Sequence, residues 1–186
     1  MRLGTLAITI AAFVGACVSS NVGTQPSTCP ADWEWSRSAD SSVSACIPPR
    51  FARARGPQYG TGARWERGSY RSPDHASLSV HIDTAFSAVE EWPPRLRATS
   101  PCTADCISVD SVVAHEDTVA GTPAHVETGL ASGGFAGLRR QPTLVAGWLQ
   151  GRHRIVVNGM ATQGAALDTL RQVVRTIRLR GSQTSR

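Results

Sequence analysis

The sequence predicts an α+β domain in which an antiparallel β-sheet packs against a small number of helices. Strand-like alternation of apolar and polar residues recurs along the chain and is strictest in residues 76–83. Helical spacing of apolar residues is confined to residues 86–92 and 163–175. The 186 residues are 41% hydrophobic and 18% charged, with a formal net charge of +5. This composition indicates one globular domain of ordinary size and excludes a disordered chain.

Seven segments carry the pattern of strands. In chain order they are residues 43–48, 64–70, 76–83, 107–115, 119–128, 143–150 and 153–159. The pair Pro48-Pro49 ends the first segment, and the break Gly121-Thr122-Pro123 falls early in the fifth. Gly151 separates the last two segments, which predicts a hairpin at that point.

The C-terminal helix has the clearer of the two helical patterns. Its apolar residues fall on one face at 3.6-residue spacing: Leu167, Leu170, Val174 and Ile177, with Ala166 and Val173 beside them. Thr162 is expected to cap this helix. Residues 176–179 either extend the C-terminal segment or finish it as a strand, and periodicity alone does not decide between them. The pair Pro93-Pro94 would end the helix over residues 86–92.

The N-terminus has the pattern of an export signal. A positive start is followed by 14 uncharged residues, Leu3 to Ala16, which are too few for a typical membrane span of about 20 residues. The run ends in Val14-Gly15-Ala16-Cys17, which resembles the lipobox of bacterial lipoproteins. The resemblance implies cleavage before Cys17, a diacylglyceryl group on its sulfur and a fatty acyl group, such as palmitate, on its new amine.

The lipobox also implies a location and a set of boundaries. Residue Val18, rather than Asp, follows Cys17, which in diderm bacteria resembles the pattern of lipoproteins sent to the outer membrane, here facing the periplasm. We expect a signal peptide over residues 1–16 and a lipidated tether over 17–28. A single α+β domain over 29–180 and a polar tail over 181–186 would follow.

The cysteine count is consistent with a lipidated Cys17. Five cysteines leave one over in an exported protein, and removing Cys17 leaves four: Cys29, Cys46, Cys102 and Cys106. Four cysteines allow three connectivities. We favour Cys29–Cys46 and Cys102–Cys106, because both are local closures.

The order of the elements carries a second resemblance. An opening strand ends in Ala45-Cys46-Ile47-Pro48-Pro49, a meander contains Val119-Ala120-Gly121-Thr122-Pro123-Ala124, and a terminal helix leads to Thr176-Ile177-Arg178-Leu179. This order resembles the PsbP/Mog1-like α/β/α sandwich, which many small bacterial lipoproteins share. That superfamily has no common chemistry, so the resemblance implies a fold and not an activity.

Three histidines are the candidates for a metal site. His81, His115 and His125 lie in predicted strands, near the carboxylates of Asp83, Glu116 and Glu127. If those strands were neighbours, imidazole and carboxylate could bind Zn²⁺ or Cu²⁺. Polar residues that alternate on a solvated sheet face give the same pattern, and no compact ligand motif occurs. We therefore expect no cofactor.

A partner surface is predicted from arginine and tryptophan. Every one of the 19 cations is Arg, and Arg64, Arg67 and Arg71 form one group. Trp33 and Trp35 alternate across Glu34, so they are expected to share a face. In an exported protein, such residues indicate binding to the membrane, to an anionic envelope component or to another envelope protein rather than to nucleic acid.

These patterns predict a lipid-anchored cell-envelope protein with a non-catalytic binding or scaffolding role. The alternative is a metal-binding envelope lipoprotein that uses the three histidines. A third class, a hydrolase, has no support from a G-x-S-x-G motif, so we do not expect an enzyme.

Overall fold

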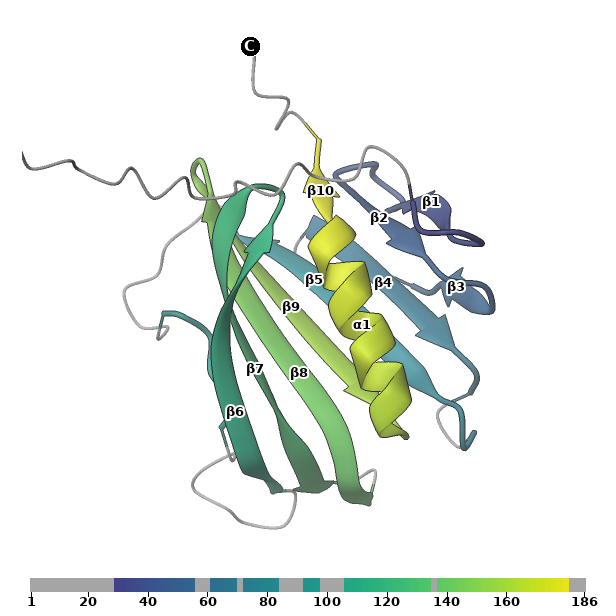
Figure 1. Cartoon of the computed structure of the whole chain (residues 1–186), viewed down its shortest axis with the longest axis vertical. Coiled ribbons are helices and arrows are strands. Elements are labelled where there is room, and N and C mark those ends of the chain that lie inside the picture. The colour runs from purple at the N-terminus through teal and green to yellow at the C-terminus, as the bar shows by residue number, and fades with distance from the viewer. Residues whose placement is uncertain are drawn as a thin grey trace, which may run out of the picture.

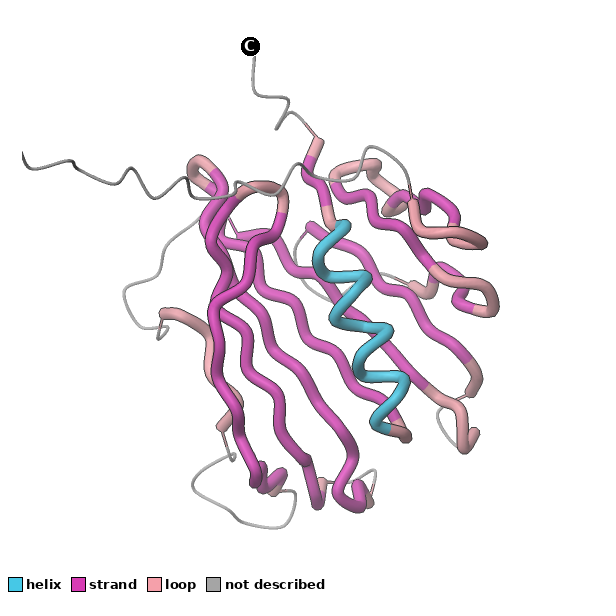
Figure 2. Tube along the Cα trace, in the orientation of Figure 1, coloured by secondary structure: helices cyan, strands magenta, loops and turns pink. Residues whose placement is uncertain are grey.

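The computed structural model describes residues 29–55, 61–69, 72–83, 92–97, 106–134 and 137–180. These residues form two antiparallel β-sheets and one α-helix (Figures 1 and 2). The strands are β1 (Glu34–Arg37), β2 (Val43–Ile47), β3 (Phe51–Arg53), β4 (Thr61–Arg67), β5 (Ala76–Asp83), β6 (Ile107–Val119), β7 (Thr122–Gly133), β8 (Leu138–Gln150), β9 (His153–Ala161) and β10 (Arg178–Leu179). The helix is α1 (Gly164–Thr176).

The larger sheet has seven strands in the order β3-β4-β5-β9-β8-β7-β6. Every pairing in it is antiparallel, including the pair β5–β9, which joins segments far apart in the sequence. The smaller sheet has the order β1-β2-β10, so the last strand of the domain pairs with the second. The predicted α+β class is therefore confirmed by the strand pairing.

Helix α1 lies across one face of the seven-stranded sheet, with β2 and β10 at its C-terminal end (Figure 1). The predicted apolar stripe is the buried one, and Leu170 and Ile177 have no exposed surface. Trp65, Leu78 and Ile155 of the sheet are equally buried and belong to the same core. Apolar side chains from one face of the large sheet, from α1 and from β2 thus form a single core.

Six of the predicted strands lie where the alternation places them, at β2, β4, β5, β6, β8 and β9, and the hairpin at Gly151 is confirmed. The strand predicted over residues 119–128 is wrong at its start. Ala120 and Gly121 have positive φ angles of 53° and 76° and form the turn of a hairpin, so Val119 ends β6 and Thr122 begins β7. The short strands β1 and β3 were not predicted, because three or four residues cannot show a period.

The predicted cap of α1 is wrong. The residue that precedes the helix is Gln163, and it makes no side-chain cap hydrogen bond. Thr162 instead donates its hydroxyl to the carbonyl oxygens of Pro73 and His75, at 2.5 and 3.1 Å, so it binds the chain that enters β5. Residues 178–179 form β10, which decides between the alternatives left open for the end of the helix.

The predicted disulfide Cys29–Cys46 is confirmed, with the two Cα atoms 5.5 Å apart. Cys106 is also disulfide-bonded, whereas Cys102 lies outside the described residues. Residues 84–91, where most of the other helix was predicted, are outside them too, as are Arg71 and residues 1–28 with Cys17. Within the ranges that the structure describes, no helix is both long enough and apolar enough to cross a membrane.

Candidate binding site on the outer face of the sheet

The outer face of the seven-stranded sheet, opposite α1, is covered in part by residues 92–97. Gly147 of β8 shows how close this cover is. A Cβ atom added there would lie 2.4 Å from Cγ and Cδ of Pro94 and 3.2 Å from the ring of Trp92. Only glycine lets the segment approach the strand so closely.

Glu127 of β7 fixes this segment to the sheet. Its side chain is only 4% exposed. Oε1 accepts a hydrogen bond from Arg95 Nη1 at 2.6 Å, and Oε2 accepts one from the backbone N–H of Leu96 at 2.7 Å. Burial would raise the pKa of the Glu127 carboxyl, but the hydrogen bonds from Arg95, His125 and Leu96 outweigh it and hold the pKa below its usual value. The carboxylate is therefore ionised and acts as a clamp on residues 95 and 96.

His125 lies between two carboxylates and one guanidinium. Its Nδ1 is 3.0 Å from Glu116 Oε1, and its Nε2 is 3.0 Å from Glu127 Oε1 and 2.9 Å from Arg95 Nη1. Both ring nitrogens are thus engaged by charged groups. Among the residues that the structure describes, no hydroxyl or thiol hydrogen-bonds to this imidazole.

A second ion pair holds the start of the segment. Arg154 of β9 is 6% exposed at its side chain, and its Nη2 lies 3.2 Å from Asp83 Oδ2. The same guanidinium lies 5.7 Å from the ring centroid of Trp92, within the range of a cation–π interaction. Charged groups of two strands, Glu127 of β7 and Arg154 of β9, therefore contact residues 92–96, and Asp83 of β5 pairs with Arg154.

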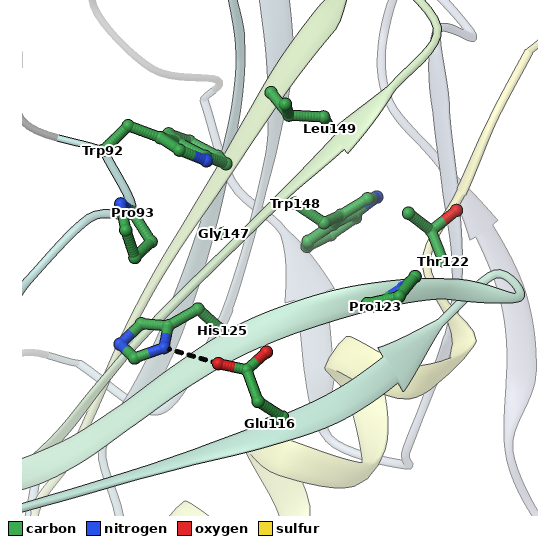
Figure 3. A pocket seen from close by; sticks show the side chains of 9 residues that line it. All are labelled: Trp92, Pro93, Glu116, Thr122, Pro123, His125, Gly147, Trp148 and Leu149. Atoms are coloured by element: carbon green, nitrogen blue, oxygen red, sulfur yellow. Dashed lines mark hydrogen bonds and ion pairs between the residues drawn. The ribbon is translucent and has the colours of Figure 1, made fainter.

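A pocket of about 280 Å³ opens between this segment and the sheet (Figure 3). Its apolar lining comes from Trp92, Pro93, Pro123, Trp148 and Leu149, with Gly147 between them. Its polar lining is Glu116, His125 and Thr122, and Figure 3 shows the His125 ring and the Glu116 carboxylate joined at one side. The Glu116 side chain is 71% exposed, so a carboxylate stands at the rim of an aromatic and proline-lined pocket.

The three histidines predicted as metal ligands are not brought together. His81 pairs with Val156, Val156 with Gly147, and Gly147 with His125, so two strands separate the two imidazoles by about 14 Å. His115 pairs with the core residue Val126 and therefore belongs to the other face. Burial lowers the pKa of the His81 imidazole. In the described part of the chain, no group of three His, Cys, Asp or Glu side chains could hold a metal ion.

The residues predicted as a partner surface are dispersed. Arg64 forms an ion pair with Glu66 on the outer face of β4. Arg67 donates to the carbonyl oxygen of Asp74 at 2.9 Å and lies 5.5 Å from the ring centroid of Phe51. Trp33 packs against the core, whereas Trp35 is 39% exposed.

Arg95 and the role of Glu127 were not predicted from the sequence. The partners of Glu127 lie 31 and 32 residues earlier, in a segment without strand or helix pattern, so no periodicity connects them. The one available signal is Gly147, because an isolated glycine in an apolar strand marks a close backbone approach.

The chain matches no protein-family model, and no curated protein sequence matches it. Among solved structures it is similar to cyanobacterial PsbP (CyanoP) from Synechocystis sp. PCC 6803, at 11% identity and a TM-score of 0.47, over 86% of this chain and 99% of that one. It is also similar to the Ran-binding protein Mog1p of Saccharomyces cerevisiae, at 12% identity and a TM-score of 0.42, over 79% and 95%. Similarities at this level transfer no function.

Proposed function

We propose that this chain is a lipid-anchored cell-envelope protein with a non-catalytic binding role, and that the pocket over the outer face of the sheet is its binding site. The anchor rests on the N-terminal sequence, in which a charged start, an apolar run and Val14-Gly15-Ala16-Cys17 occur in the order of a lipoprotein signal. In this proposal Cys17 carries the lipid and the domain faces the periplasm from the outer membrane.

The observation that carries the binding role is the clamp made by Glu127. Burying a carboxylate costs free energy, and here it is offset by Arg95 and the Leu96 N–H of the covering segment together with His125 of the same strand. The clamp binds residues 95 and 96, next to Trp92 and Pro93, which line the pocket together with Pro123 and Leu149. A preformed concave site with apolar walls and a few polar groups is typical of ligand binding.

The chemistry of the pocket favours a ligand that carries a cationic group next to an apolar one. The exposed Glu116 carboxylate at the rim supplies the negative charge. The Trp92 ring, which already has the Arg154 guanidinium 5.7 Å from its centroid, supplies apolar surface together with Pro93 and Leu149. Both His125 nitrogens contact charged side chains, and no hydroxyl or thiol of the described ranges hydrogen-bonds to them, which supports binding rather than hydrolysis.

The metal-binding alternative has less support, since His81, His115 and His125 lie on two faces of the sheet. Metal analysis of the purified chain tests it. Stoichiometric Zn²⁺ or Cu²⁺ that is lost on replacing these histidines would establish the alternative and overturn the proposed binding chemistry.

Two measurements test the proposed function. For the anchor, labelled fatty acid should enter the wild-type chain and not Cys17→Ala, and equal labelling of both would contradict it. For the pocket, choline should change the tryptophan fluorescence, whereas its uncharged isostere 3,3-dimethylbutanol should not. Glu116→Gln should weaken the choline response, and Asp168→Asn, an exposed carboxylate on α1, is the matched control. Equal responses to both compounds would rule out a cation-selective site.

A further inference from the structure

The small sheet has two faces of different character. On β2, Val43, Ala45 and Ile47 are buried in the core. Because side chains alternate along a strand, Ser44 and Cys46 lie on the opposite side. The small sheet therefore presents a second face that does not belong to the core.

This second face is basic and aromatic. Ser44 pairs with Arg37 on one side and with Arg178 on the other, so the two arginines flank it. Trp35 lies two residues from Arg37, and the Arg178 guanidinium is 4.5 Å from its ring centroid. Arg53 adds a further cation, with Nη1 3.5 Å from the Arg37 carbonyl oxygen. We call Trp35, Arg37, Arg53 and Arg178 the basic–aromatic face.

The carboxylates nearest to Arg37 and Arg53 in the described ranges are engaged elsewhere or lie on the other side of the strand. Asp40, in the turn between β1 and β2, accepts hydrogen bonds from the hydroxyls of Ser38 and Ser42 at 2.5 and 2.7 Å. Glu34 has the opposite side-chain direction to Trp35, because the two are consecutive in β1. No carboxylate of the described ranges forms an ion pair with Arg37 or Arg53.

A disulfide bond joins this face to Cys29, which follows the segment that begins at Cys17. Trp35 pairs across the ladder with Cys46, and Cys46 is bonded to Cys29. Between Cys17 and Cys29 the sequence has 11 residues, and even a fully extended chain of this length spans at most about 40 Å. A lipid on Cys17 would thus hold the basic–aromatic face within about that distance of a bilayer.

We propose that the basic–aromatic face docks on the anionic phospholipid headgroups of the membrane that holds the anchor. The inference rests on the proposed lipidation of Cys17. Guanidinium groups bind phosphate through paired hydrogen bonds, and tryptophan is enriched at the boundary between headgroups and acyl chains. Docking fixes the orientation of the domain, so that the pocket is presented in one direction.

The test uses the full-length chain, lipidated through its own N-terminus, in vesicles whose acyl chains carry bromine to quench tryptophan. The vesicles contain phosphatidylcholine, alone or mixed with phosphatidylglycerol. We expect stronger quenching in the anionic vesicles, and we expect Trp35→Phe to abolish that difference. Each basic residue near an anionic surface strengthens attachment roughly fivefold, so Arg37→Glu with Arg178→Glu should weaken docking by roughly 25-fold or more.

The matched control makes the same change of charge outside this face. Arg139→Glu with Arg140→Glu, on β8, should leave the quenching as in the wild type. Quenching that is equal in both vesicle types, or that the Arg37/Arg178 variant retains, would overturn the docking proposal. Flotation distinguishes the proposed lipid anchor on Cys17 from the proposed docking of the basic–aromatic face. A chain that floats with both vesicle types has an anchor whether or not it docks. A chain that floats with neither lacks the anchor and overturns both.

Discussion

The two faces of the seven-stranded sheet are held by different kinds of interaction. The inner face packs Leu78 and Val80 against α1 through hydrocarbon, with no exposed surface on either side chain. The outer face holds residues 92–97 through Glu127 and Arg154, two buried charges with partly exposed partners. The inner face therefore provides stability that neither pH nor salt changes much, whereas the outer face is where a modest perturbation can alter a pocket without unfolding the domain.

The strongest way to break the inner face is Leu170→Asp. This change places an unpaired charge where the side chain has no exposed surface, and it should cost several kcal/mol of unfolding free energy. Thermal unfolding followed by circular dichroism should show an unfolded or strongly destabilised chain. Gln172→Asp, on the exposed side of α1, is the control and should melt near the wild type. A wild-type melting temperature for Leu170→Asp would show that the helix does not pack as described.

On the outer face, Glu127→Gln should have the next largest effect. It keeps the shape of the side chain but removes the charge that Arg95 and His125 contact, at an expected cost of about 2–3 kcal/mol. Urea unfolding gives the free energy, and hydrogen exchange should show faster exchange of the Leu96 amide. Glu116→Gln, at an exposed side chain, should cost less than about 0.5 kcal/mol. Equal effects of the two variants would mean that Glu127 is not the clamp.

Gly147→Ala tests the close approach of residues 92–97 to the outer face of β8. The added Cβ would overlap Pro94 and should push residues 92–97 away from β8, at an expected cost of about 1–2 kcal/mol. The fold should persist, because this strand backbone does not require glycine, but the choline response should fall. Gly164→Ala, where an added Cβ meets no atom, is the control and should not destabilise the chain. An unchanged choline response in Gly147→Ala would contradict the proposal that residues 92–97 form one wall of the choline site.

The smallest expected effect is the pH dependence of the clamp. Its hydrogen bonds hold the pKa of the Glu127 carboxyl below its usual value of 4.5, so the unfolded chain takes up this proton at higher pH than the folded chain does. Its stabilisation is complete above about pH 4.5 and is lost as the pH falls through the folded pKa. The difference in unfolding free energy between wild type and Glu127→Gln should therefore shrink in acid. A difference that stays constant from neutral pH down to strong acid would show that the charge of Glu127 does not stabilise the fold.

Much of the fold could be predicted because its strands are long enough to show a period. Residues 76–83 alternate strictly and form β5 with the same boundaries, and the stripe through Leu167 and Leu170 is the buried face of α1. Cys29–Cys46 was predictable because both cysteines close a short loop. These features depend on local spacing, which a single sequence displays.

The site was less predictable because its contacts are not local. The sequence pattern associated His125 with Glu127 and His115 with Glu116, whereas the contact between His125 and Glu116 comes from the β6–β7 register, which pairs these two residues. Arg95 comes from a segment without periodicity, and Thr162 binds Pro73, which lies 89 residues earlier, instead of capping the helix beside it. In each case a long-range partner decides what a polar side chain does.

The proposed function requires that the domain be attached to a membrane through Cys17. The intact mass of the chain extracted from membranes measures this attachment. We expect the mass of a polypeptide that begins at residue 17 and carries a diacylglyceryl group on its sulfur. A chain that begins at any other residue, or one with an unmodified thiol at Cys17, would contradict it.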